Sequence, residues 1–469
     1  MACSKKLRAE KLPQTDRSDF DKDGSFAFVT ALLPSSAAQA MRLPINSRTW
    51  LTAKRLRAHG SILLLCLWSL YVWNLATPGL RDRNGNLKGT DFLHFYTLGS
   101  LALDHHGADL YDMNEQSTWA AQRVPEAAGI SYLPMYPPQV SILFAPFARL
   151  SYAWALSLWW LSSAMIYFAC CYFLLRACPH LREYSALVFL LAFANPAFFH
   201  LIAWGQTSAL ALGCCTLMFF CLRGNYEFLA GLALGGLIFK PQLGLAAAVV
   251  FLASGSWKIL AGAALSAFAE TGIGVLYYGI DPLRKWAATL LHAQQVLPLL
   301  EPKAYQTYSL RTFWSMIIPW GDLSLALYIL SAIAVLAVTI ACWKRKSPSP
   351  LALRYSALLL TTVLVAPHLT VYDLVLLAPA FILLADWLIQ QASTRLTRAT
   401  GTLLYLVYML PLLGPLSRWT HIQLADLAMA ALLYTIWRAS EFAIQRETTA
   451  PREISAPTPT RDAFRPLQS

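Results

Sequence analysis

The sequence predicts an all-α protein that crosses a membrane many times. Of its 469 residues, 57% are hydrophobic and only 13% are charged, whereas soluble globular chains carry about 25% charged residues. The hydrophobic residues gather in runs long enough for helices to cross a bilayer, and the 16 tryptophans suit its two interfaces. The net charge of +12 comes from short basic clusters between these runs, so it indicates membrane topology and lipid contact rather than nucleic-acid binding.

The chain is expected to divide into three parts. Residues 1–59 contain no spanning run and are rich in charge, which predicts a cytoplasmic, largely disordered tail, with Met41 as an alternative start. Residues 60–438 hold the apolar runs and form the membrane domain. Residues 439–469 mix Pro, Thr and Arg without an apolar period, so we expect a second disordered cytoplasmic tail.

About twelve spans are expected when the Lys and Arg clusters are kept on the cytoplasmic side. The segment 138–150 is left out, because it is short and contains Pro146; we expect it to be re-entrant or interfacial. Both chain ends are then cytoplasmic, and the long first loop carries interfacial helices on the outer side. The predicted spans are 60–77, 152–175, 185–201, 207–222, 228–239, 243–253, 259–280, 323–343, 351–366, 372–389, 402–416 and 422–437.

The polar interval after the first span contains the first candidate for catalysis. Asp91 precedes a helical apolar pattern that includes Phe92, Gly99 and Leu103. Thr90 or Asp91 is therefore placed to cap this helix. A carboxylate at this position is either a plain helix cap or a general base, and the sequence leaves both interpretations open.

Lys240 interrupts an apolar stretch that would otherwise form one long span, and Pro241 breaks the helix beside it. An ionisable group at membrane depth costs about 2.5–3.5 kcal/mol on insertion scales, so it usually faces a cavity. The alternative is that its ammonium extends to the lipid head groups. His368 has a similar double interpretation, helix-end packing or an imidazole directed into the same cavity, and Asp373 is expected to orient a neighbour.

No sequence motif indicates a metal or a nucleotide cofactor. The sequence has no GxGxxG after a strand, no Walker loop, no HExxH and no GxSxG. The nine cysteines form no CxxC pair and suit helix packing, and the pair His105/His106 lacks metal-ligand spacing. We therefore expect no metal and no resident cofactor.

A series of short motifs runs along the chain. They are Gly89-Thr90-Asp91-Phe92, Leu110-Tyr111-Asp112, Tyr136-Pro137-Pro138, Asn195-Pro196, Gly205-Gln206, Lys240-Pro241-Gln242, Pro367-His368 and Tyr372-Asp373. In their order and spacing these motifs resemble glycosyltransferase family eighty-seven over about residues 60–420. The family consists of GT-C membrane enzymes and includes polyprenol-phosphate-mannose-dependent α-mannosyltransferases. The resemblance implies a GT-C fold, a donor such as decaprenyl-phosphate mannose, a catalytic aspartate matching Asp91 and an important late histidine matching His368.

The chemistry of such a transfer assigns roles to further residues. An ionised Asp91 suits the base for the acceptor hydroxyl, and positive donors suit the departing phosphate. Because the leaving group brings its own phosphate, no divalent metal is required in principle. Lys240, His368 and Arg311 are expected at the phosphate. The remaining expected contacts are Gln206, Tyr136, Tyr96, His94 and Gln242 for the donor, with Asp373 and Tyr372 in support.

Two functional classes follow from these observations, and a polymerase or ligase that moves a whole lipid-linked glycan is a third hypothesis close to the first. The first is a transferase that moves a hexose, by resemblance mannose, from a polyprenyl-phosphate sugar to a lipid or glycan acceptor at the outer face of the cell membrane. The second is a transporter or flippase whose broken helices and buried Lys240 form a substrate site. No repeat symmetry between the two halves supports the transporter. The basic N-terminal extension matches nothing in the family, and the acceptor stays open.

Overall fold

The computed structural model describes residues 51–292, 303–344 and 349–449, and this part of the chain is helical without any strand longer than an isolated bridge. The expected all-α architecture is confirmed. The first helix, α1 (Ala53–Leu75), begins before the boundary expected at residue 60, and the last, α20 (Leu424–Thr449), continues past the boundary expected at residue 438. Most of the two predicted tails, residues 1–50 and 450–469, lies outside the described residues.

Six helical segments of the described chain are long and apolar enough to cross a membrane, or seven if a pair bent by 47° is one span. A polytopic membrane protein is thereby confirmed, but the number twelve is not. Several predicted spans form short helices instead; 228–239, for example, becomes α9 (Glu227–Gly235) and η4 (Gly236–Phe239). The six segments are α1, α5 (Tyr152–Ala177), α11 (Trp257–Tyr278), α15 (Gly321–Lys344), Val371–Ile389 and Arg395–Thr420, and the bent pair is Arg182–Phe193 with Pro196–Trp204.

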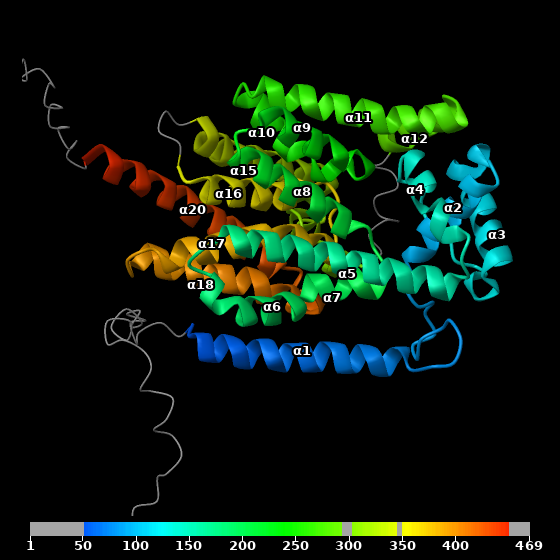
Figure 1. Ribbon diagram of the computed structural model, residues 1–469, viewed down its shortest axis with the longest axis horizontal. Helices are drawn as coiled ribbons and strands as arrows, with labels where there is room; N and C mark the ends of the chain where they lie inside the picture. The colour runs from blue at the N-terminus through cyan, green and yellow to red at the C-terminus, as the bar shows by residue number, and fades with distance from the viewer. Residues whose placement is uncertain (1–50, 293–302, 345–348, 450–469) are drawn as a thin grey trace, which may run out of the picture. The chain divides into compact units, whose positions relative to one another are not determined.

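The long helices run side by side, and shorter helices pack between them (Figure 1). The central α8 contacts α5, α9 and the turn η7, and α16 lies against α10, α15, α17 and α20. These contacts bury one large apolar core that extends from α5 to α20. The remaining bounds are α6 (Ser185–Phe193), α7 (Pro196–Trp204), α8 (Ser208–Arg223), η5 (Pro241–Leu243), α10 (Leu245–Ala253), α14 (Leu310–Ile317), α16 (Leu351–Val365), η7 (Val371–Leu377), α17 (Ala378–Ile389), α18 (Arg395–Met409), η8 (Leu410–Leu416) and α19 (Ser417–Thr420).

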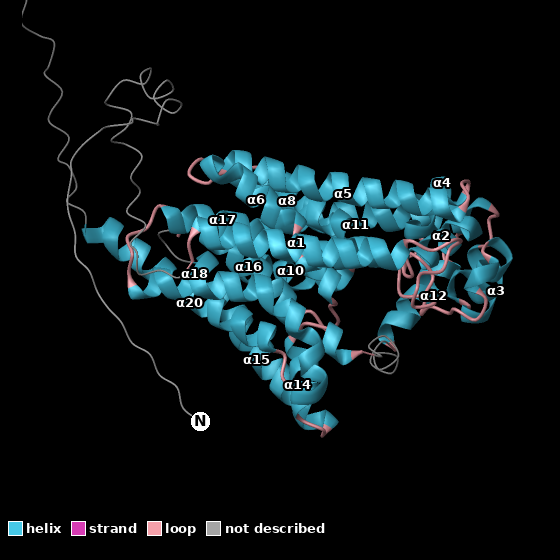
Figure 2. Ribbon diagram, turned by 90° about the horizontal axis from the view of Figure 1, so that it is seen from below, coloured by secondary structure: helices cyan, strands magenta, loops and turns pink. Residues whose placement is uncertain are grey.

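The long first loop folds into a helical layer at one end of the described bundle, as two perpendicular views show (Figures 1 and 2). α2 packs closely on α4, because Gly99 lets the two backbones approach; a Cβ there would overlap the carbonyl oxygen of Phe144. α4 has only 10 residues, which agrees with the expectation that 138–150 does not span. The layer consists of α2 (Phe92–Leu103), η1 (Gly107–Tyr111), α3 (Met113–Arg123), η2 (Pro125–Ala127), α4 (Gln139–Ala148) and α12 (Asp281–Leu291), and η6 (Ala304–Gln306) follows α12 in sequence.

Candidate active site

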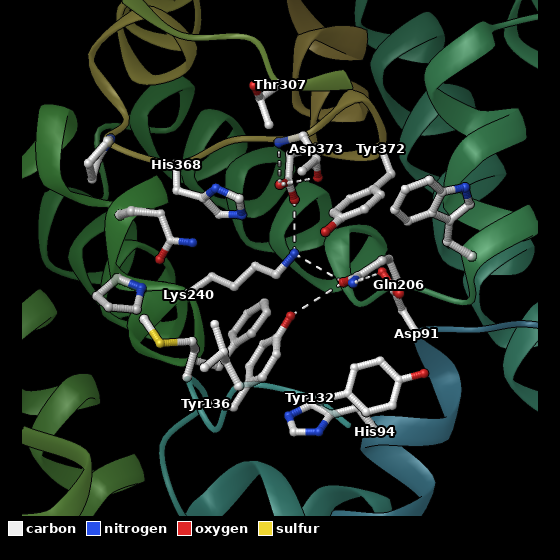
Figure 3. A pocket seen from close by; sticks show the side chains of 18 of the residues that line it. Asp91, His94, Tyr132, Tyr136, Gln206, Lys240, Thr307, His368, Tyr372 and Asp373 are labelled. Atoms are coloured by element: carbon white, nitrogen blue, oxygen red, sulfur yellow. Dashed lines mark hydrogen bonds and ion pairs between the residues drawn. The ribbon is translucent and has the colours of Figure 1, made fainter. Parts of the chain in front are cut away.

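A cavity of about 860 Å³ lies where this outer layer meets the bundle (Figure 3). Its size is in the range of small-molecule sites. Segments that are far apart in the sequence converge on it: the start of α2, the stretch 131–136, the end of α7, the break around residue 240, and the segments 303–307 and 367–373. The residues that the sequence singled out therefore collect at one place.

Asp91 occupies the N-cap position of α2, but its side chain makes no capping hydrogen bond. Instead, its Oδ2 accepts a hydrogen bond of 2.6 Å from Nε2 of Gln206. Oδ1 receives no hydrogen bond from the described residues. Removal from water raises the pKa of the Asp91 carboxyl to about 6, although the Gln206 hydrogen bond and the Lys240 charge lower it. The Asp91 side chain therefore does not cap α2 and is held at the cavity by Gln206 instead.

Gln206 reaches Asp91 because α7 ends abruptly just before it. Asn195 caps the start of α7, and Gly205 ends the helix with a left-handed φ of 71°. The main-chain N–H of Asp91 then donates to the carbonyl of Trp204 at 3.0 Å, and the indole of Trp159 donates to Gly205 at 3.0 Å. These bonds fix the end of α7 against the start of α2.

Gly205→Ala is expected to destabilise the protein by about 1–3 kcal/mol. An added Cβ would stand 2.7 Å from Cβ of Phe92, and the positive φ disfavours any side chain. Movement of the backbone at position 205 should also displace Gln206 and slow turnover. Gly213→Ala is the matched control, because its Cβ meets only Ile166 at 3.7 Å in the middle of α8. Equal thermal unfolding of the two variants would contradict the prediction.

Lys240 lies between the short helices η4 and η5, so the break predicted at Pro241 is present. Lys240 is only 4% exposed, and its ammonium points into the protein rather than toward head groups. Nζ donates to Oδ1 of Asp373 at 2.9 Å, to Oγ of Ser208 at 3.1 Å and to Oε1 of Gln206 at 3.3 Å. It also lies 5.0 Å from the ring centre of Tyr372, as a cation–π pair.

Asp373 belongs to the capping box that opens η7. Its Oδ2 accepts from the main-chain N–H and the hydroxyl of Thr370, at 3.3 and 3.4 Å. Its Oδ1 accepts from Lys240 and from the hydroxyl of Ser208. Both carboxylate oxygens of Asp373 thus accept hydrogen bonds from other residues of the protein, and Asp373 holds these neighbours in place.

The other wall of the cavity is aromatic. The hydroxyl of Tyr136 donates to Oε1 of Gln206 at 3.3 Å. His94 is 4% exposed, and its ring lies 5.1 Å from that of Tyr132 and 5.7 Å from that of Tyr136. Neither ring nitrogen of His94 has a hydrogen-bond partner among the described residues. This wall combines flat faces with an unbonded imidazole, a combination suited to a hydroxylated ring.

Most of the expected site residues line the cavity, but two do not. Tyr96 points away from it, packs on Tyr152 and donates its hydroxyl to the carbonyl of Leu150 at 2.9 Å. Arg311 donates to the carbonyl of Pro367 and so lies behind the segment that carries His368. The expected residues that do line it are Asp91, His94, Tyr136, Gln206, Lys240, Gln242, His368, Tyr372 and Asp373.

Three contributors were not assigned a role from the sequence. Ser208 connects Lys240 and Asp373, Tyr132 donates its hydroxyl to the carbonyl of Thr90, and Lys303 lines the cavity. Ser208 follows Gln206 by two residues, so its place beside a site residue was a weak signal. No group of three or more His, Cys, Asp or Glu in the described ranges is arranged to hold a metal ion.

Comparison with known proteins gives one match. Residues 134–367 match the model of glycosyltransferase family 87. The matched range contains Tyr136, Gln206 and Lys240, and it ends one residue before His368. Searches of the curated proteins and of the solved structures found no match. The family decides against the transporter: the chain is a membrane glycosyltransferase and belongs to glycosyltransferase family 87.

Proposed function

We propose that the protein transfers a hexose, mannose by the resemblance, from a polyprenyl-phosphate sugar to a hydroxyl of a lipid or glycan acceptor. The observation that carries the proposal is the carboxylate of Asp91 at the cavity, with Oδ2 held by Gln206 and Oδ1 without a bond from the described residues. A carboxylate that keeps one oxygen available is suited to take the proton of an attacking hydroxyl.

The proposed step is a single displacement. Asp91 takes the proton of the acceptor hydroxyl, the acceptor oxygen forms a bond to the anomeric carbon, and the bond from that carbon to the phosphate oxygen breaks. The electron pair leaves with the polyprenyl phosphate, and the anomeric centre is inverted. Asp373, the other carboxylate among the described residues that line the cavity, is engaged by Lys240, Ser208 and Thr370, which argues against a second nucleophile.

The departing phosphate is proposed to lie at the side of the cavity formed by Lys303 and His368. Lys303 is exposed, lines the cavity and replaces Arg311 as the expected cation, since Arg311 lies behind Pro367. Lys240 suits this role less well, because Asp373 already neutralises its charge at 2.9 Å. Charge-assisted donors at the developing phosphate charge would stabilise the leaving group.

The test uses purified protein in lipid vesicles with radiolabelled donors. Polyprenyl-phosphate mannose and polyprenyl-phosphate glucose are compared with the matching nucleotide sugars, each with a panel of phospholipid and glycolipid acceptors. We expect label to reach a lipid product from a polyprenyl-phosphate sugar, and none in the Asp91→Asn variant. Transfer from nucleotide sugars alone would refute the proposed donor, and product formation without any acceptor dependence would refute the transferase reaction.

We further propose that the cavity faces the outside of the cell membrane. Most helix ends away from the cavity carry a basic residue, which is typical of a cytoplasmic face. The outer layer also has basic residues, such as Arg81 and Lys285, but there they are interspersed with acidic side chains of the first loop, such as Asp104, Asp109 and Asp112. The basic set at the far helix ends includes Lys54, Arg176, Arg223, Lys258, Lys344 and Arg395.

Cysteine labelling checks this orientation. In a background without native cysteines, Asn86→Cys should react with an impermeant maleimide added to intact cells, because Asn86 is exposed in the loop after α1. Ser393→Cys, exposed between α17 and α18, should react only after the membrane is opened. Labelling of both positions in intact cells would contradict the orientation.

A further inference from the structure

We propose that Lys240 acts on the transfer through Gln206: it fixes the side-chain amide of Gln206 so that its NH₂ group holds the carboxylate of Asp91. Lys240 is then a positioning residue rather than the ligand of the donor phosphate. The inference rests on the proposed function in taking Asp91 as the base, and one of its tests needs no turnover at all.

The hydrogen bonds of Lys240 to the protein leave none of its N–H donors for a substrate. An ammonium has three N–H donors and no acceptor. All three are directed to protein oxygens, on Asp373, Ser208 and Gln206, at 2.9–3.3 Å. The charge is matched by Asp373 inside a site where the two side chains are 5% and 3% exposed. A phosphate at this ammonium would have to displace one of these partners.

The orientation of the Gln206 amide follows from its neighbours. An ammonium can only donate, so the Gln206 atom 3.3 Å from Lys240 must be the carbonyl oxygen. The main-chain N–H of Thr207 and the hydroxyl of Tyr136 donate to the same oxygen, each at 3.3 Å. The NH₂ group is therefore left on the side of Asp91, where it donates at 2.6 Å.

Loss of this orientation would affect Asp91 directly. Without Lys240 only the Thr207 N–H and the Tyr136 hydroxyl, each at 3.3 Å, hold the amide oxygen, so the amide turns over more readily and then places its oxygen against the carboxylate oxygens of Asp91. Two acceptors in contact repel each other, so the carboxylate would move or hold its proton more tightly. Among the described residues, the charged and titratable groups around Asp91 are His94 of α2, Tyr132, Tyr136, Tyr152 of α5, Lys240, Tyr372 and Asp373.

The first measurement follows the proton on Asp91 without any reaction. A hydrophobic carbodiimide modifies protonated buried carboxyls, and mass spectrometry reads its adduct at Asp91 as a function of pH. We expect the midpoint to lie at higher pH in Lys240→Met and in Gln206→Leu than in the parent. The variant Lys240→Met/Asp373→Asn keeps the site neutral and serves if Lys240→Met alone does not fold. An unchanged midpoint in all of these folded variants would overturn the proposal.

The second measurement is kinetic, with polyprenyl-phosphate mannose as donor. Lys240→Met/Asp373→Asn and Gln206→Leu should each lower kcat by about 10–10²-fold, since small misplacements cost this much. The donor KM should change less than about threefold. Combining Lys240→Met/Asp373→Asn with Gln206→Leu should add less than about twofold, because both changes act at the same hydrogen bond.

The outcomes separate the alternatives. A donor KM raised tenfold or more with kcat and the carbodiimide midpoint unchanged would make Lys240 a phosphate ligand and overturn the proposal. The proposal would also be overturned if the fold-losses of kcat caused by the Lys240 and Gln206 changes multiplied in the combined variant. A parent-like kcat in the folded Lys240→Met/Asp373→Asn variant would show that Lys240 has only a structural role, and would overturn the proposal as well. If the parent transfers nothing from any polyprenyl-phosphate sugar, the proposed function fails, and the carbodiimide titration still decides the role of Lys240.

Discussion

Asp91→Asn is expected to slow hexose transfer by about 10²–10⁴-fold, the usual effect of removing a general base. Asparagine has nearly the same shape, and its amide oxygen can still accept from Gln206. It cannot take a proton from an acceptor hydroxyl. Folding should be unaffected, because the Asp91 side chain does not cap α2.

The measurement is single-turnover transfer with saturating donor, together with thermal unfolding and donor binding. Asp104→Asn is the control: Asp104 is half-exposed, pairs with Arg123 at 3.0 Å and lies away from the cavity. We expect the control to stay near the parent rate. A rate for Asp91→Asn within about threefold of the parent, far inside the expected loss, would remove Asp91 as the base.

The same carboxylate predicts the pH dependence of the rate. Burial raises the pKa of Asp91 to about 6. A base works in its ionised form, so transfer should be near its plateau above this value and fall as the pH drops through it. Asp91→Asn should lose this acidic limb together with most of its rate. An acidic limb that persists unchanged in the variant would assign it to another group.

Lys240→Met is expected to lower the free energy of unfolding by about 3–5 kcal/mol, the cost of removing one partner from a buried ion pair. The carboxylate of Asp373, 2% exposed, would be left without its 2.9 Å counter-charge. Adding Asp373→Asn removes the stranded charge, and Asn can still accept from Ser208. The double variant should therefore recover most of the lost stability.

Thermal unfolding in one detergent, followed by circular dichroism, compares the parent with the single and double variants. Arg284→Met is the control, because its pair with Asp281 at 3.2 Å is largely exposed, with side chains 72% and 79% accessible. Such surface pairs contribute less than about 1 kcal/mol. A double variant as unstable as Lys240→Met would show that the ion pair is not the source of the loss.

The sequence predicted the helical class and most of the cavity lining, because both depend on local signals. Pro241 beside Lys240 marks a break in any apolar helix, and η4 and η5 meet there. The number of membrane spans could not be predicted in the same way. A run such as 351–366 is apolar because it is buried among other helices, and burial in protein and contact with lipid select the same side chains.

Tyr96 and Arg311 were expected at the cavity but do not line it. They differ in whether the sequence contains a signal that places them elsewhere. Tyr96 follows Asp91 by five positions, which places it about 140° around a helix, whereas His94 lies within about 60°. Helical periodicity alone therefore separates Tyr96 from the cavity. Arg311 carries no such signal, since its position behind Pro367 depends on how α14 packs against α16. The pairing of Lys240 with Asp373, 133 residues apart, likewise depends on the tertiary fold.

The unbonded imidazole of His94 has a consequence for ligand selectivity. Folding has already removed both ring nitrogens from water, and no residue of the described ranges replaces the lost hydrogen bonds. An unsatisfied buried polar group costs about 1–3 kcal/mol. A ligand that offers a hydroxyl to this ring recovers that cost on binding, and an analogue without the hydroxyl leaves it in place. The ring therefore favours a ligand that supplies the hydroxyl and adds nothing for an analogue that lacks it, so we expect the cavity to discriminate against deoxygenated analogues by about this amount.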